Sequence, residues 1–119
     1  MFEELKKSFE GEIYCDEAMR TLYATDASAY KEMPLAVCFP KSENDIKALI
    51  IFVREKRLSL IPRTAGTSLA GQVVGSGIIV DVSKYLTKII EIKDEQEFVR
   101  VGPGVVRNEL NKELEPLGY

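Results

Sequence analysis

The residues of this chain whose types and spacing could do chemistry lie in segment 62–72, Pro-Arg-Thr-Ala-Gly-Thr-Ser-Leu-Ala-Gly-Gln. The segment combines glycines, hydroxyl side chains and one arginine: Gly66 and Gly71, then Thr64, Thr67 and Ser68, then Arg63. Glycine permits left-handed turns that bring backbone N–H groups together. Hydroxyls and a guanidinium add donors for anionic oxygens. This composition favours the binding of a phosphate or pyrophosphate.

The glycine-containing segments also allow three other interpretations. Loops rich in Gly, Ser and Thr join strands in many proteins without binding anything. No Gly-Lys-Ser/Thr follows the glycines, so P-loop nucleotide hydrolysis is not predicted. Gly102-x-Gly104 resembles the start of a dinucleotide fingerprint, but Arg107 stands where the third glycine belongs. A Rossmann site is therefore not predicted either.

The elements around segment 62–72 decide where it lies. Residues 35–39 are apolar and indicate a strand buried on both faces. Ser42 can cap the helix that follows, whose apolar positions are Ile46, Leu49, Ile50 and Val53. Residues 58–61 form the next apolar run, so the pattern predicts a βαβ unit with parallel strands and a right-handed crossover. Segment 62–72 then follows the carboxyl end of a strand, where ligands bind in open α/β sheets.

The first thirty residues predict two short helices. Residues 2–9 carry Phe2, Leu5 and Phe9 on one stripe, and Gly11 is expected to end that helix. Asp16 can cap a second helix that runs to about residue 23. Its inward-facing residues are expected to be Ala18, Met19 and Leu22.

The second half of the chain predicts further strands and a final helix. Residues 78–82 indicate a strand that carries an acid, Asp81, expected to contact backbone amides or solvent. Residues 89–92 and 98–101 predict an antiparallel hairpin joined by the charged turn 93–97. Residues 108–117 predict a helix with Leu110, Leu114 and Leu117 on one face, closed by Gly118.

Composition limits the classes of function. At 119 residues, 45% apolar and 29% charged, the chain is one globular domain at most. A net charge of −3 argues against a nucleic-acid surface. No apolar run is long enough for a transmembrane segment, and the N-terminus Met1-Phe2-Glu3-Glu4 is unlike a signal peptide, so we expect a cytoplasmic protein.

The reactive side chains are few. Cys15 and Cys38 stand apart without a metal-binding spacing, so reduced thiols and no metal site are expected. The chain has no histidine, which removes the commonest general base and every Ser-His or Cys-His nucleophile system. No residue is therefore predicted to be catalytic.

Several motifs, taken together in order, resemble a known family. They occupy residues 23–28, 34–37, 62–71, 79–83, 99–104 and 110–114. This arrangement is similar to FAD-linked oxidases of the vanillyl-alcohol oxidase / p-cresol methylhydroxylase (PCMH) type. Within them it looks most like the D-2-hydroxy-acid dehydrogenases, including D-lactate dehydrogenase and the FAD subunit of glycolate oxidase. The likeness covers about residue 22 to the end.

The resemblance implies a fold and a set of cofactor-binding residues. It implies an α+β fold with an α/β-like start: a βαβ unit, then mixed and antiparallel strands with flanking helices. The amides of Arg63, Thr64, Ala65, Gly66, Thr67 and Ser68 would cradle the FAD diphosphate. Gly71 and Gln72 would continue that wall, and Pro103 and Gly104 would pass near the flavin or its ribityl chain. Some relatives attach the flavin covalently through a histidine in this loop; this chain has none, so it is expected to bind FAD non-covalently.

The length of the chain is short for that family, whose pattern continues beyond residue 119. We therefore expect an N-terminal part of an FAD-binding domain, inactive alone. It would comprise a helical segment (about 1–30), the βαβ unit with the pyrophosphate loop (about 34–75), and the start of a second subdomain (about 76–119). The hydroxy-acid substrate would bind only in the full-length parent. Exposed apolar surface predicts self-association of the isolated chain.

Three functions remain open from the sequence. The first is the FAD-binding portion of an oxidoreductase that transfers a hydride from a D-2-hydroxy acid of the lactate or glycolate type to flavin. The second is a small α/β interaction or structural module without a ligand. The third is part of a related FAD reductase of the enolpyruvyl reductase type.

Overall fold

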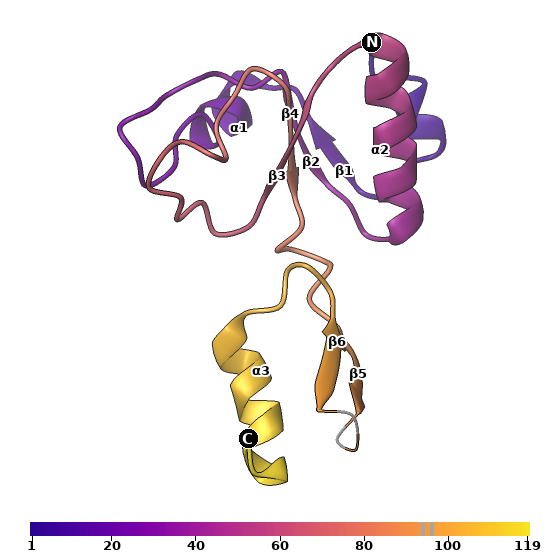
Figure 1. The fold of residues 1–119 in the computed structure, drawn as a ribbon. Coiled ribbons are helices and arrows are strands. Elements are labelled where there is room, and N and C mark those ends of the chain that lie inside the picture. The colour runs from indigo at the N-terminus through magenta and orange to yellow at the C-terminus, as the bar shows by residue number, and fades with distance from the viewer. Residues whose placement is uncertain (94, 96) are drawn as a thin grey trace.

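The computed structural model describes residues 1–93, 95 and 97–119. It has an α+β fold, in which a four-stranded mixed sheet with helices on both faces is followed by a two-stranded hairpin and a C-terminal helix (Figure 1). The predicted fold class is confirmed.

The described elements follow one another from a short 3₁₀ turn at the N-terminus to another at the C-terminus. They are η1 (Leu5–Lys7), β1 (Glu12–Tyr14), α1 (Glu17–Leu22), β2 (Ala36–Phe39), α2 (Glu43–Lys56), β3 (Leu60–Arg63), β4 (Ile78–Asp81), β5 (Ile89–Lys93), β6 (Phe98–Val101), α3 (Arg107–Leu114) and η3 (Glu115–Leu117).

The first sheet has the strand order β1-β2-β4-β3. Strands β2 and β3, which α2 connects, both run parallel to β4 and are separated by it. The predicted parallel arrangement of β2 and β3 is confirmed, while β4 supplies the hydrogen bonds between them. All four residues of β4 are buried, which suits a central strand. Strand β1 pairs with β2 in the antiparallel direction.

Alternation along β2 and β4 divides the core between the two faces of the sheet. Ala36, Cys38, Ile78 and Val80 pack against α2 and the N-terminal arm, with Leu5, Leu49 and Phe52 among their neighbours. The opposite face carries Val37, Phe39 and Ile79, against which Met19, Tyr23 and Ile61 pack. Figure 1 shows α2 and α1 on these opposite sides of the sheet.

Helix α2 begins as predicted, because the Ser42 hydroxyl accepts a hydrogen bond from the Asp45 amide at 3.2 Å. Its buried face differs from the predicted one, since Asp45 and Phe52 are buried while Ile50 is 51% exposed. The carboxylate of Asp45 accepts the backbone amides of Glu10 and Lys41, each at 2.8 Å. These two bonds explain how an acid is accommodated at a position with no exposed surface.

The N-terminal arm is less helical than predicted. Only Leu5–Lys7 form a helical turn, although Phe2, Leu5 and Phe9 are buried as their shared stripe indicates. Strand β1 was not predicted, because three residues carry too little periodicity to indicate a strand.

Helix α1 begins at the predicted cap, where the Asp16 carboxylate accepts the Met19 amide at 3.0 Å. Of its expected inward residues, Met19 packs on the sheet, whereas Ala18 and Leu22 are exposed, Leu22 at 70%. A six-residue helix on the sheet surface covers it with one turn only, so the inward stripe is shorter than the sequence pattern suggests.

The C-terminal part agrees with the predicted hairpin and helix. Strands β5 and β6 pair in the antiparallel direction, with an irregularity between Ile89 and Glu91. The predicted charged turn 93–97 includes residues 94 and 96, which lie outside the described residues. Helix α3 continues into η3, which Gly118 closes at a φ of 89°. Strand β4 completes the first sheet.

Candidate functional site

The glycine-rich loop leaves the sheet at the edge predicted from the sequence. Because β2, β3 and β4 are parallel, Phe39, Arg63 and Asp81 end their strands at this same edge. Residues 64–77 leave β3 there, and segment 82–88 leaves β4 beside them. We call residues 63–72 the phosphate loop.

The backbone of the phosphate loop leaves a set of donors without protein acceptors. Gly66 and Gly71 have φ values of 69° and 75°, in the left-handed region that glycine adopts without steric cost. Within the described chain, the amides of residues 64–69 donate no hydrogen bond to another protein atom, and neither do the hydroxyls of Thr64, Thr67 and Ser68. This donor set matches the oxygen acceptors of a diphosphate.

The guanidinium of Arg63 is engaged within the protein. Its Nη1 donates to the carbonyl oxygens of Thr25 at 2.8 Å and Tyr23 at 3.4 Å. The group also lies over the Tyr23 ring, with 4.9 Å between Cζ and the ring centroid. A Cβ added to Gly66 would lie 2.4 Å from Nη2 of Arg63, so the loop backbone packs directly on this guanidinium.

Residues 23–30 contact the phosphate loop, and we call them the brace. The Ala27 amide donates to the Gly66 carbonyl at 3.0 Å. The Tyr30 ring fills the space beside Gly71, where an added Cβ would lie 2.7 Å from it. The brace thus contacts the loop near both of its positive-φ glycines.

Asp26, within the brace, has an internally bonded carboxylate. Its Oδ1 accepts the Ser28 amide at 2.8 Å and the Ser28 hydroxyl at 2.5 Å. The Ser28 bonds, with help from the nearby Val73 amide, hold the pKa of Asp26 below its usual value. Its Oδ2 is buried and accepts no hydrogen bond of good geometry. Asp26 therefore shapes the brace.

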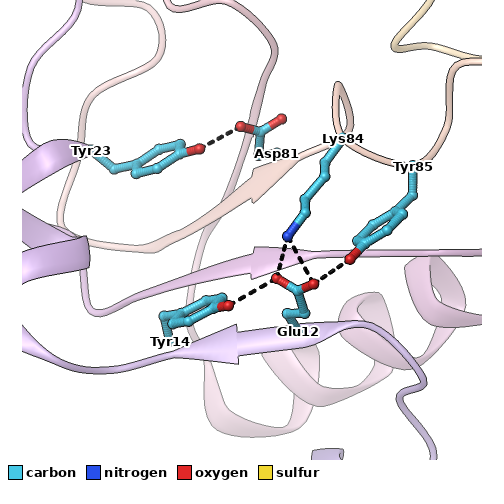
Figure 2. A network of polar contacts seen from close by, with 6 residues as sticks. All are labelled: Glu12, Tyr14, Tyr23, Asp81, Lys84 and Tyr85. Carbon is cyan, nitrogen blue, oxygen red and sulfur yellow. Dashed lines mark hydrogen bonds and ion pairs between the residues drawn. The ribbon is translucent and has the colours of Figure 1, made fainter.

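Asp81 connects the brace to the centre of the sheet. It is 5% exposed, and its Oδ2 accepts the Tyr23 hydroxyl at 2.6 Å (Figure 2). Its Oδ1 accepts both the amide and the hydroxyl of Ser83, at 2.8 and 2.6 Å. The expected contact of Asp81 with a backbone amide is confirmed. Burial and the bond to Asp81 together raise the pKa of Tyr23.

A second polar cluster links β1 to the segment after β4 (Figure 2). The Glu12 carboxylate accepts Lys84 Nζ at 2.8 and 2.7 Å, the Tyr14 hydroxyl at 2.9 Å, and the Tyr85 hydroxyl. The bond from Lys84, followed by that from Tyr85, lowers the pKa of Glu12 to about 2. Every member is paired within the protein, so the cluster ties edge strand β1 to the sheet.

Pro103 and Gly104 lie against the segment that follows β4. The Gly104 amide donates to the Leu86 carbonyl at 2.9 Å, and an added Cβ would lie 2.2 Å from the Val82 oxygen. Pro103 lines a groove of about 440 Å³ with Tyr85 and Leu86. Both residues therefore pack on backbone that leaves the same sheet edge as the phosphate loop.

The structure thus places the ten predicted cofactor-binding residues in two groups. Residues 63–68, Gly71 and Gln72 form one loop, in which Gln72 Oε1 accepts the Ala70 amide at 3.2 Å. Pro103 and Gly104 form the second group. The sequence reasoning missed the brace, although the run Tyr-Ala-Thr-Asp-Ala-Ser at 23–28, used for the family likeness, marks it.

The structure also bears on metal sites, on the two thiols and on membrane-spanning helices. Among the described residues, no group of three or more His, Cys, Asp or Glu side chains could hold a metal ion. Both cysteines are free thiols; Cys15 is exposed, and burial raises the pKa of Cys38 to about 12. No helix of the described chain has the length and apolar character to cross a membrane.

Comparison with known proteins identifies the family. Residues 34–119 match the family model described as FAD binding domain. The chain is 40% identical over 120 residues to D-2-hydroxyglutarate dehydrogenase of Pseudomonas putida and 32% identical over 103 residues to glycolate oxidase subunit GlcD of Bacillus subtilis. The matches cover 98% and 85% of this chain but 12% and 22% of those proteins.

A solved structure shows the same fold. An alkyldihydroxyacetonephosphate synthase superposes with a TM-score of 0.83 at 18% sequence identity, covering 97% of this chain and 24% of that one. The family model covers residues 34–119, and the chain is similar to D-2-hydroxyglutarate dehydrogenase, glycolate oxidase subunit GlcD and D-lactate dehydrogenase. The chain belongs to the FAD binding domain family.

Proposed function

We propose that this chain holds the diphosphate of FAD non-covalently in the phosphate loop, within a flavin-dependent oxidoreductase that oxidises a D-2-hydroxy acid. The observation that carries the proposal is the set of amides at residues 64–69 that lack protein acceptors, at the carboxyl edge of a parallel sheet. Ligands bind at that edge in open α/β sheets.

Each predicted residue has a role in this proposal. The amides from Arg63 to Ser68 surround the diphosphate, and the hydroxyls of Thr64, Thr67 and Ser68 add donors. Gly71 and Gln72 extend the wall. Pro103 and Gly104 lie near the flavin or its ribityl chain, a placement supported by their packing on segment 82–86.

The residues present fit a non-covalent flavin. The chain contains no histidine, the residue through which a loop of this kind would be attached to flavin. Bound FAD supplies an acceptor for a hydride, while the protein positions it. The chain itself contributes backbone amides and hydroxyls as hydrogen-bond donors, in a loop whose shape would position the cofactor.

The substrate class comes from the relatives. D-2-hydroxyglutarate dehydrogenases and a glycolate oxidase subunit resemble this chain over most of its length. Because the chain spans 12% to 22% of their lengths, the hydroxy-acid substrate belongs to the proposal for the whole protein. Free Cys15 and Cys38 suit a cytoplasmic location, where thiols remain reduced.

The test is made on the full-length protein that contains this chain. We expect the visible absorption of bound flavin, and release of all of it to the supernatant when acid precipitates the protein. D-lactate, glycolate and D-2-hydroxyglutarate are then added anaerobically, with the L-enantiomers of the chiral acids as controls. Bleaching by a D-acid or glycolate supports the substrate class. A folded protein that takes up no FAD would refute the proposal.

The 119-residue chain by itself is proposed to self-associate. Its hairpin presents apolar side chains to solvent, with Ile90 at 56%, Ile92 at 36% and Phe98 at 38% exposure. An exposed apolar hairpin is a common pairing site. Light scattering after size exclusion should give a mass above 13.4 kDa at high concentration, and a constant monomer mass would contradict this.

A further inference from the structure

We propose that the guanidinium of Arg63 has a positioning role: it binds to the brace and holds the phosphate loop in shape, and this guanidinium does not itself bind the anion. The inference rests on the proposed function of the phosphate loop as a diphosphate site. It concerns what keeps the amides of residues 64–69 together before any ligand arrives.

The first support is the set of partners that Arg63 already has. Its Nη1 donates to the carbonyl of Thr25 at 2.8 Å and also approaches that of Tyr23 at 3.4 Å. Its Cζ lies over the Tyr23 ring, 4.9 Å from the ring centroid. To move to an anion at the loop amides, the guanidinium would have to give up both the short bond and the cation–π contact.

The second support is the packing of the loop on this guanidinium. Gly66 has a φ of 69°, and its missing Cβ would lie 2.4 Å from Nη2 and 2.9 Å from Cζ of Arg63. The backbone at Gly66 therefore packs directly against the guanidinium, and only the Cα hydrogen of the glycine fits between them. Removing the guanidinium removes the surface on which this turn is formed.

The third support is that the brace is itself anchored. The Tyr23 hydroxyl donates to buried Asp81 at the end of central strand β4. The Ala27 amide donates to the Gly66 carbonyl at 3.0 Å, so the brace also contacts the loop backbone directly. A loop fixed in this way has its conformation ordered on folding, which reduces the entropy lost on binding.

Lysine should not replace Arg63 if this inference holds. An ammonium keeps the charge and can still donate hydrogen bonds, but it lacks the planar group that lies over the Tyr23 ring and packs against Gly66. A direct anion contact, by contrast, depends mainly on the positive charge. Lysine and glutamine substitutions therefore separate the two roles.

The experiment uses full-length protein carrying Arg63→Lys or Arg63→Gln, with Arg54→Lys and Arg54→Gln on the exposed end of α2 as matched controls. Two quantities are measured: the dissociation constant of FAD, and hydrogen exchange of the Ala27 amide in FAD-free protein. We expect both Arg63 variants to raise the dissociation constant at least tenfold and to speed Ala27 exchange at least tenfold. The Arg54 variants should change neither quantity by more than twofold.

The outcomes separate positioning from direct binding. If Arg63→Lys binds FAD like the wild type while Arg63→Gln does not, the charge acts directly and the inference is overturned. Unchanged Ala27 exchange in both variants would overturn it as well. Should Arg63→Gln fail to fold by circular dichroism, Arg63→Lys alone decides. If the wild type itself binds no FAD, the proposed function fails, while Ala27 exchange still reports on loop positioning.

Discussion

The contact between Gly66 and Arg63 permits a quantitative prediction. Gly66→Ala places a methyl group 2.4 Å from Nη2 of Arg63, closer than any stable contact, at a φ of 69°. Gly118→Ala also places an alanine at a positive φ, 89°, but with no atom within 4 Å of the new Cβ. An alanine in the left-handed region costs about 1–2 kcal/mol at either position. Comparing the two variants therefore removes much of this shared cost from the difference in stability.

The remaining difference follows from the bonds that Arg63 would lose as it moves away. A hydrogen bond from a charged donor contributes about 1.5–3 kcal/mol, and a cation–π contact at an accessible site about 0.5–1 kcal/mol. Arg63 is half-buried, so its guanidinium can replace part of the lost bonding with hydrogen bonds to water. We therefore expect Gly66→Ala to lower the free energy of unfolding by about 1–3 kcal/mol more than Gly118→Ala.

The assay is urea unfolding of the full-length protein and its variants, completed by a double-mutant cycle. In an Arg63→Ala background the guanidinium is absent, so the extra cost of Gly66→Ala should fall close to zero. Equal destabilisation by the two glycine variants would refute the reasoning. So would an extra cost that survives in the Arg63→Ala background, because another contact would then be responsible.

Three further predictions follow from the polar contacts and the thiols. Tyr23→Phe leaves Asp81, 5% exposed, without one donor, and should lower the free energy of unfolding by about 1–3 kcal/mol by urea titration; no change would show that solvent replaces the hydroxyl. Glu12 has a pKa lowered from the usual 4.5 to about 2, so its stabilisation is complete above pH 4.5 and is lost as pH falls toward 2. The stability difference between wild type and Glu12→Gln should shrink over that range, and a constant difference would contradict the pairing. Within residues 1–119, a thiol reagent at pH 8 should modify Cys15 and spare buried Cys38 until the protein is denatured, as peptide mapping would show.

Local pattern determined much of the fold. The apolar run at 35–39, the cap at Ser42 and the run at 58–61 predicted β2, α2 and β3 in parallel strands, because strand and helix periodicities are properties of neighbouring residues. Glycines and hydroxyls at 64–71 likewise indicated a loop of free donors, since glycine permits positive φ at any position.

Long-range packing decided the rest. Strand β4 lies between β2 and β3, and β1 joins the edge, because sheet order depends on contacts between residues far apart in the chain. Asp45 is buried through the amide of Glu10, 35 positions away, which no helical pattern reveals. These contacts exist only once the chain has folded.

The candidate site shows the same division. The residue types of segment 62–72, together with its place after an apolar strand, favoured a phosphate-binding loop, and the family resemblance implied the FAD diphosphate. Only the tertiary structure showed that the Arg63 guanidinium faces Tyr23 and Thr25, about 40 residues earlier in the chain. The type of a side chain determines which groups it can bind. Folding then determines which backbone carbonyls and aromatic rings lie close enough to become its partners.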